Sequence, residues 1–167
     1  TFATPPHTVQ FIMAGGNRAL GTGLEANEDS TLLGKQAILK HKPTRNDVII
    51  GIAASGRTPF TIAAVQTARR AGATTIAITS NPGSPLEKAA DFAIVVQTGP
   101  EVVSGSTRMK AGTAEKLVLN MLSTGAMVRL GYVYGNLMVN LRGANTKLSE
   151  RSVTILQRAV PMERNAA

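Results

Sequence analysis

Residues 47–60 read DVIIGIAASGRTPF, an apolar run that ends in hydroxyl side chains and glycine before a helical pattern begins. Positions 48–50 and 52 are all apolar. They lack the alternation of apolar and polar residues that is typical of a strand with one solvent-exposed face. This pattern is typical of a strand covered on both faces of a parallel sheet. The stretch therefore predicts a strand, a turn and a helix in succession.

The turn at residues 55–58 carries groups that suit a phosphate. Ser55 and Thr58 have hydroxyl donors, and Gly56 lets backbone N–H groups approach a ligand. Pro59 fits the first turn of a helix, whose positive N-terminal end would face that ligand. An ordinary capped turn with Ser55 or Thr58 as N-cap would use the same residue types. Both interpretations stay open on these residues alone.

Strand and helix patterns alternate on both sides of this stretch. Strands are predicted at residues 8–13, 48–52, 74–79 and 92–96, and helices near residues 30–39, 60–70, 86–90, 114–130 and 145–160. This alternation is typical of parallel βαβ units, in which ligands bind beyond the carboxyl ends of the strands. The sequence therefore predicts an α/β fold with a mostly parallel sheet flanked by helices.

Three hydroxyl-rich segments follow predicted strands, at residues 55–58, 79–84 and 98–107. Their coincidence at strand ends is stronger evidence for a ligand site than any one of them. The third segment, extended to residues 99–113, also carries a glutamate and two cations. It precedes a long helix whose apolar stripe we expect to be largely buried.

An acidic patch, Glu28 and Asp29, interrupts an otherwise basic chain just before a predicted helix. Asp29 or Ser30 could cap that helix. Acidic side chains near a helix N-terminus are common because they interact favourably with the helix dipole. From these residues alone, helix stabilisation is sufficient to explain the patch.

The composition fits one domain with a hydrophobic core over residues 1–167, since 43% of the residues are hydrophobic and 17% are charged. The formal net charge is +8, but the basic residues are dispersed, and the longest basic run is the pair Arg69-Arg70. Aromatic residues make up 4% and Trp is absent, which leaves few stacking platforms for bases. The basicity therefore favours an anionic small molecule as partner, or simply solubility, and we do not expect nucleic acid as a partner.

Cysteine is absent, which excludes disulfides, thiolate catalysis and Cys-ligated metal within this sequence. No apolar run reaches the length of a membrane span, and the first residues do not resemble a signal peptide. The expectation is a soluble cytoplasmic protein that does not bind membranes.

Longer motifs carry a family resemblance. Residues 48–60, the Asn81-Pro-Gly-Ser84 turn and above all the block EVVSGSTRMKAGTAEKLVLNMLST at residues 101–124 resemble the N-acetylmuramic acid 6-phosphate etherases. These are sugar isomerase (SIS) domain proteins, and the glucokinase regulatory protein is a relative. The resemblance extends from about residue 9 to about residue 156. It implies a three-layer α/β/α SIS domain.

The resemblance also implies an activity. The family cleaves the D-lactyl ether of N-acetylmuramic acid 6-phosphate, giving N-acetylglucosamine 6-phosphate and D-lactate in the recycling of cell-wall sugars. In this family, lactate is eliminated after abstraction of the C2 proton, and water then adds to the unsaturated intermediate. Two glutamates act as acid and base. No metal or redox cofactor takes part. Glu28 matches one of these glutamates. The family usually pairs two SIS domains, so a homodimer with the site at the interface is expected.

By this resemblance the phosphate of the amino-sugar 6-phosphate is expected at Ser55, Gly56 and Thr58. Three further hydroxyl side chains are expected around the sugar, those of Ser104, Ser106 and Thr107.

The sequence departs from the family at both ends. The family's first strand, a glycine- and serine-rich turn, the second glutamate before a Pro-Pro-Thr motif and a small C-terminal helical region are not in this sequence. We expect either part of a longer protein or a true fragment without etherase activity. A sugar-phosphate sensor or regulatory module is the alternative, because it would keep the phosphate turns without needing the catalytic pair.

Overall fold

The computed structural model describes residues 2–21, 25–160 and 162–163. The described residues form two compact units, one over Phe11–Val118 and a smaller one from the first residues to Gln10 together with the chain from Leu119 onward. The larger unit contains two short 3-10 helices and most of the regular structure: η1 (Gly16–Leu20), η2 (Glu25–Asn27), α1 (Thr31–Lys40), β1 (Val48–Ile52), α2 (Pro59–Arg70), β2 (Thr74–Thr79), α3 (Pro85–Ala89), β3 (Phe92–Val95) and the start of α4 (Lys110–Arg129).

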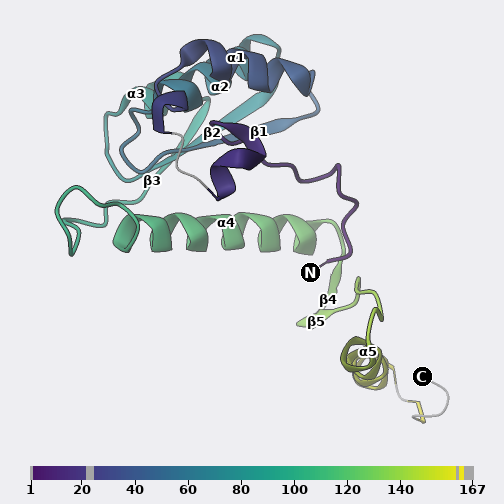
Figure 1. The fold of residues 1–167 in the computed structure, drawn as a ribbon. Coiled ribbons are helices and arrows are strands. Elements are labelled where there is room, and N and C mark those ends of the chain that lie inside the picture. Colours follow the sequence, from purple (N-terminus) through teal and green to yellow (C-terminus); the bar gives the residue numbers. More distant parts are fainter. Residues whose placement is uncertain (1, 22–24, 161, 164–167) are drawn as a thin grey trace. The chain divides into compact units, whose positions relative to one another are not determined.

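The three long strands form a parallel sheet in the order β1-β2-β3. The register places Ile50 beside Ile76, and Ile78 beside both Ile52 and Ile94. Helices α1, α2 and α3 lie on one face of this sheet, and the first turns of α4 lie on the other side (Figure 1). The α/β fold with a parallel sheet between helical layers is therefore confirmed.

Two clusters of buried side chains hold the helices on the sheet. The first joins α1 to α2 through Ile38, Ala64 and Ala68. The second joins α2 and α3 to β2 through side chains that include Val65 and Leu86. Small alanine side chains let these elements approach closely, so the helices shield one face of the sheet from water.

Two predictions from the sequence were wrong, one about a strand and one about the burial of a helix. Residues 8–13 form turns and irregular structure instead of a strand, and Phe11 is 69% exposed, because no neighbouring strand pairs with this segment among the described residues. The apolar stripe of α4 is only partly buried. Val118 and Met127 are buried, but Leu117 is 49% and Met121 66% exposed. The periodic pattern located the helix correctly and overestimated its cover.

The smaller unit contains the second half of α4, the antiparallel pair β4 (Val133–Tyr134) and β5 (Leu137–Met138), and α5 (Thr146–Ala159). The Asn140 side chain donates to the Phe2 carbonyl at 2.7 Å, which joins the start of the chain to the segment after β5. None of the described helices combines the length and the apolar character that crossing a bilayer requires.

Candidate functional site

A pocket of about 320 Å³ opens at the carboxyl ends of the strands in the larger unit. It lies where βαβ folds usually bind ligands, because the loops that leave parallel strands diverge at this edge. Segments that follow all three strands supply its lining, together with the loop before α4 and the first turn of that helix. The lining residues are Ala54, Ser80, Asn81, Pro82, Gln97, Thr98, Gly99, Glu101, Thr107 and Ala111.

The Ala54 carbonyl oxygen organises one wall of the pocket. It accepts the Ser80 N–H at 3.0 Å, the Asn81 side-chain amide at 3.0 Å and the Thr79 hydroxyl at 3.2 Å. These three bonds fix the segment after β2 against the segment after β1. The buried hydroxyl of Ser80, in contrast, has no hydrogen-bond partner among the described residues. It is a free donor and acceptor in the lining of a pocket, where a ligand could satisfy it.

The turn at residues 55–58 is tightly built around Gly56. Gly56 has a φ of +65°, and a Cβ atom there would collide with the Ser84 side chain and lie 2.7 Å from the Thr79 hydroxyl. Its N–H donates to the Ala53 carbonyl at 2.8 Å, so this donor is engaged within the turn. The Ser55 hydroxyl accepts the Arg57 N–H at 3.2 Å and keeps its own proton to donate.

Thr58 is the N-cap residue of α2, but its side chain makes no capping hydrogen bond. The Phe60 N–H at the same helix end donates to the Glu28 carbonyl at 2.9 Å, and Pro59 has no N–H. The sequence predicts that the N-terminal end of α2 faces a ligand. In the structure the Phe60 N–H at this end is already bonded to Glu28, so it is not free for a ligand. The Thr58 hydroxyl has no part in capping the helix and is a candidate ligand donor.

Glu28 lies beside this turn because its backbone bonds to α2. The Gly34 backbone also lies so close to the Phe60 carbonyl that a Cβ atom at position 34 would collide with it. The Glu28 side chain is exposed. Ser30 caps α1 by accepting the Leu33 N–H at 3.2 Å, so α1 does not depend on a Glu28 cap. The structure thus brings Glu28 next to the predicted phosphate turn.

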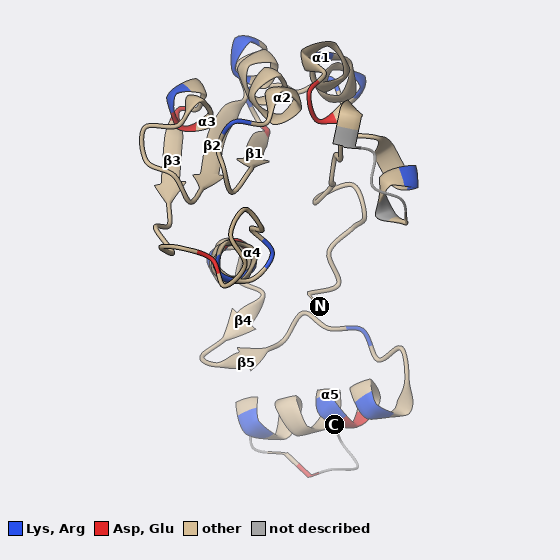
Figure 2. Ribbon diagram, turned by 60° about the vertical axis from the view of Figure 1, so that its left-hand side comes forward, with Lys and Arg blue, Asp and Glu red and all other residues tan. Residues whose placement is uncertain are grey.

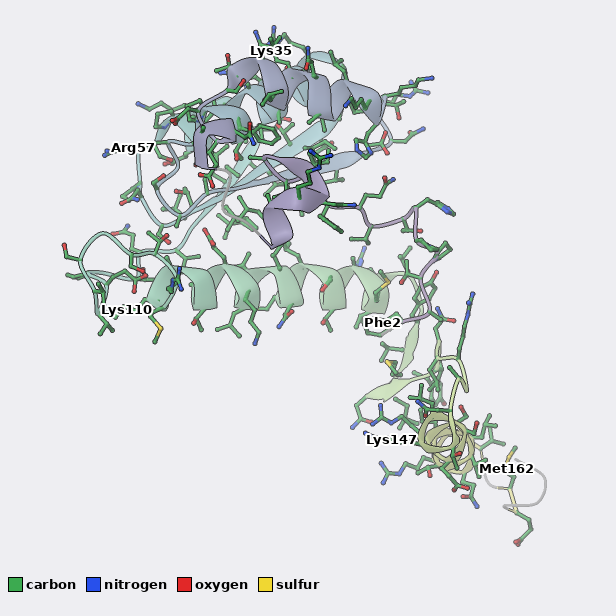
Figure 3. The ribbon with its side chains drawn as sticks, in the orientation of Figure 1. Phe2, Lys35, Arg57, Lys110, Lys147 and Met162 are labelled. Carbon is green, nitrogen blue, oxygen red and sulfur yellow. The ribbon has the colours of Figure 1, made fainter. Side chains whose placement is uncertain are left out.

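The loop between β3 and α4 carries the other predicted site residues. Thr107 lines the pocket, Ser106 is partly exposed and Ser104 is exposed. Glu101 accepts the Ala111 and Lys110 N–H groups at 3.0 Å each, and these bonds hold the pKa of its carboxyl below the usual value. Arg57 and Lys110, both labelled in Figure 3, mark the turn before α2 and the start of α4.

Sequence reasoning missed several residues of the pocket. Ser80, Asn81, Thr98 and Glu101 lie within the hydroxyl-rich segments that the sequence analysis singled out, but they were not chosen as site residues. Ser80 and Asn81 directly follow β2, and Thr98 and Glu101 lie in the loop after β3, which was the available signal. Gln97 had no comparable signal beyond its place after β3.

The described residues that line the pocket carry hydroxyl, amide and carboxylate side chains, and none of them is Lys or Arg. Figure 2 shows Lys and Arg scattered over several helices of the larger unit. Among the residues that the structure describes, no three His, Asp or Glu side chains gather where a metal ion could bind. Hydroxyls, amides and neighbouring cations are the groups that this edge of the sheet offers.

Two family models match the chain. The SIS domain model matches residues 36–125, and the model of the glucokinase regulatory protein N-terminal SIS domain matches residues 2–69. The first match includes the three strands of the parallel sheet and all the residues that line the pocket.

Curated relatives are similar along the whole chain. A protein of Symbiobacterium thermophilum named N-acetylmuramic acid 6-phosphate etherase is 52% identical over 167 residues, which cover 100% of this chain and 55% of the relative. A protein of the same name from Aeromonas hydrophila subsp. hydrophila is 50% identical over 167 residues, 100% of this chain and 56% of the relative. The chain spans about half the length of the curated relatives it matches.

Proposed function

The chain belongs to the SIS domain family, and from this premise we propose that it is the sugar-phosphate-binding part of an N-acetylmuramic acid 6-phosphate etherase. The observation that carries the proposal is the 52% identity over all 167 residues to a relative of that name. The substrate would be the 3-O-lactyl ether of an amino-sugar 6-phosphate, and the products N-acetylglucosamine 6-phosphate and D-lactate.

The pocket together with the adjacent 55–58 turn, which follows the lining residue Ala54, supports an amino-sugar phosphate as ligand. We place the phosphate at the 55–58 turn, where the Ser55 and Thr58 hydroxyls can donate and the exposed Arg57 adds positive charge. Gly56 contributes by letting the turn pack on Ser84 and Thr79. We place the sugar hydroxyls toward Ser104, Ser106 and Thr107 on the loop before α4, where Thr107 lines the pocket.

Glu28 is the proposed proton-transfer residue. The reaction breaks the C3–O bond to lactate after loss of the C2 proton, and water then adds to the unsaturated sugar. A carboxylate beside the bound sugar can exchange the proton, which contributes about 10²–10⁴-fold to the rate of such steps. The assignment is supported by the exposure of the Glu28 side chain and by the bond of its backbone carbonyl to the Phe60 N–H, at the start of the helix that follows the 55–58 turn.

The decisive experiment compares Glu28→Gln with Asp29→Asn. D-lactate release from N-acetylmuramic acid 6-phosphate is measured on the chain and, where the natural protein is longer, on the whole protein. We expect roughly 10²-fold or greater loss for Glu28→Gln, since the amide cannot exchange the proton, and little loss for Asp29→Asn. Calorimetry should show that both variants still bind N-acetylglucosamine 6-phosphate.

Equal, near-native rates for the two variants would contradict the role of Glu28. Binding of N-acetylglucosamine 6-phosphate without any lactate release by the whole protein would instead favour a sugar-phosphate sensor. If no sugar phosphate binds at all, the proposed function fails.

We further propose a homodimer that works in the cytoplasm, where charged sugar phosphates are retained by the membrane. The exposed apolar side chains of α4, among them Leu117 and Met121, offer a surface for a second copy. Light scattering of the wild type and of Met121→Lys tests this proposal. A wild type that stays monomeric at high protein concentration would contradict it.

A further inference from the structure

The loop that crosses from β3 to α4 is closed at its base by one carboxylate. Glu101 precedes the loop, and its two oxygens accept the N–H groups of Lys110 and Ala111 at 3.0 Å each. The Lys110 ammonium group reaches back to the Pro100 carbonyl at 2.8 Å. The two ends of the loop are therefore joined by three charge-assisted hydrogen bonds.

Few other bonds hold the loop itself. The Ser106 N–H donates to the Val103 carbonyl at 3.1 Å, and the Gly112 N–H donates to the Thr107 carbonyl at 2.9 Å. Val102 and Val103 are 75% and 63% exposed, so burial contributes little to the order of this segment. The position of residues 104–107 thus depends on the closure at Glu101.

Glu101 also lines the pocket, together with Thr107 and Ala111. Its carboxylate occupies the place at the α4 N-terminus where an anion would otherwise be attracted. A phosphate that enters the pocket meets a negative charge at this helix. The 55–58 turn, with its hydroxyl donors, follows Ala54 directly and lies next to the lining instead of within it. The start of α4 is therefore less favourable for a phosphate than the neighbouring 55–58 turn.

We propose that Glu101 is a positioning residue with two effects: it holds residues 104–107 across the pocket to contact the sugar, and it excludes the phosphate from the N-terminus of α4. The phosphate is thereby directed to Ser55 and Thr58, and the ligand binds in one orientation. The assignment of sugar and phosphate rests on the proposed function, whereas the closure of the loop does not.

The test uses Glu101→Gln, which keeps the size of the side chain. The Gln side chain has one amide oxygen, which can still accept a backbone N–H, and one NH₂ group, which cannot. One hydrogen bond and the negative charge are therefore lost. Asp47→Asn is the matched control, because the Asp47 carboxylate likewise accepts a backbone N–H, from Thr44 at 2.8 Å, but it precedes β1 at the opposite edge of the sheet. Hydrogen exchange of residues 102–111 and calorimetric titration with two probes, N-acetylglucosamine 6-phosphate and inorganic phosphate, are measured for each variant.

We expect faster exchange of residues 102–111 in Glu101→Gln than in wild type and in Asp47→Asn. Affinity for N-acetylglucosamine 6-phosphate should fall about three- to tenfold, the scale of a lost hydrogen bond, while affinity for inorganic phosphate should stay the same or rise. If Glu101 had only a structural role, the substitution would lower the affinity for both probes equally. Unchanged exchange, or equal losses for both probes, would overturn the proposal.

The two proposals can fail separately. If wild type binds neither probe, the proposed function fails, and the exchange measurement still decides whether Glu101 closes the loop. If wild type binds sugar phosphate and Glu101→Gln binds it equally well, the positioning role fails and the proposed function stands.

Discussion

The two edges of the parallel sheet differ in how completely their polar groups are paired. At the amino edge, Asp91 accepts the Thr75 N–H at 2.9 Å, the Thr75 hydroxyl at 2.7 Å and the Arg69 side chain at 2.7 Å. Asp47, just before β1, accepts both the N–H and the hydroxyl of Thr44 at 2.8 Å. At the carboxyl edge, the buried Ser80 hydroxyl has no partner among the described residues, and Thr58 leaves its helix uncapped by a side chain.

This difference separates stability from binding. A carboxylate that already has its donors contributes to the folded state and has little left to offer a ligand. A buried hydroxyl without a partner costs free energy in the empty protein, about 1–3 kcal/mol, and regains it when a ligand bonds to it. Substitutions at the amino edge should therefore change stability, and substitutions at the carboxyl edge should also change binding.

The largest effect is expected at Gly56. An Ala there must adopt a left-handed backbone and collide with Ser84, which should cost roughly 2–4 kcal/mol of unfolding free energy and weaken sugar-phosphate binding. Gly83→Ala is the control, since Gly83 has a similar φ of +72° but open space around a Cβ atom. It should cost only about 1–2 kcal/mol. Urea unfolding measures both, and equal losses would show that contact with Ser84 does not matter.

At the amino edge, Asp91→Asn should lower stability and leave sugar-phosphate affinity unchanged. Hydrogen bonds from Thr75, assisted by Arg69, hold the pKa of Asp91 below its usual value of 3.8. The charged form therefore stabilises the folded state above about pH 3.8, and this contribution is lost as the pH falls through the lower folded-state pKa. Unfolding curves of both proteins should differ near pH 7 and converge in acid. A constant difference at all pH values would contradict the role of the charge.

Ser80→Ala should give opposite signs for stability and binding. Removing an unpaired buried hydroxyl should leave the empty protein equally stable or more stable, by up to about 1 kcal/mol. Affinity for N-acetylglucosamine 6-phosphate should fall by about 0.5–1.5 kcal/mol, the scale of one hydrogen bond. Thermal unfolding and calorimetry on one preparation measure both. A variant that loses stability without losing affinity would place Ser80 among the structural residues.

The smallest effect is expected at Glu115 on α4. Its Oε1 atom is buried without a hydrogen-bond partner among the described residues, and burial raises the pKa of its carboxyl above 4.5. The folded state therefore disfavours the charged form, and this cost grows as the pH rises above 4.5. Glu115→Gln should stabilise the protein by less than about 1 kcal/mol near pH 7, because the group is partly solvated. The gain should vanish in acid; a gain that persists there would point to a different cause.

Local patterns in the sequence were sufficient to predict most of the regular structure. The apolar runs at 48–52 and 74–79 became β1 and β2, and Ser30 caps α1 by the hydrogen bond that its type and position indicate. The segment at residues 8–13 was mispredicted because alternation of apolar residues does not tell whether another strand lies beside them. The exposed stripe of α4 has the same origin, since periodicity does not tell what covers a helix.

The site was predictable in its location and less so in its detail. The three hydroxyl-rich segments do meet at one edge of the sheet, as parallel connections require. Which groups remain free could not be read from the residues, because the Gly56 N–H, the Phe60 N–H and the Ala54 carbonyl are engaged by backbone geometry. The predicted roles of Glu28, Ser55 and Thr58 stay predictions, as does the extent of the single SIS domain over residues 1–167.

The Ala54 carbonyl has a consequence for spectroscopy. A carbonyl oxygen has two lone pairs, yet this one accepts three donors from the segment at residues 79–81. Such loading withdraws electron density from the C=O bond, so its stretching frequency should be lower than that of the other carbonyls. A carbon-13 label at Ala54 would then give a separate infrared band within the pocket wall. A shift of that band on addition of a sugar phosphate would show that the ligand enters the pocket. The measurement needs no mutation, because the label changes only the isotope of one carbon atom.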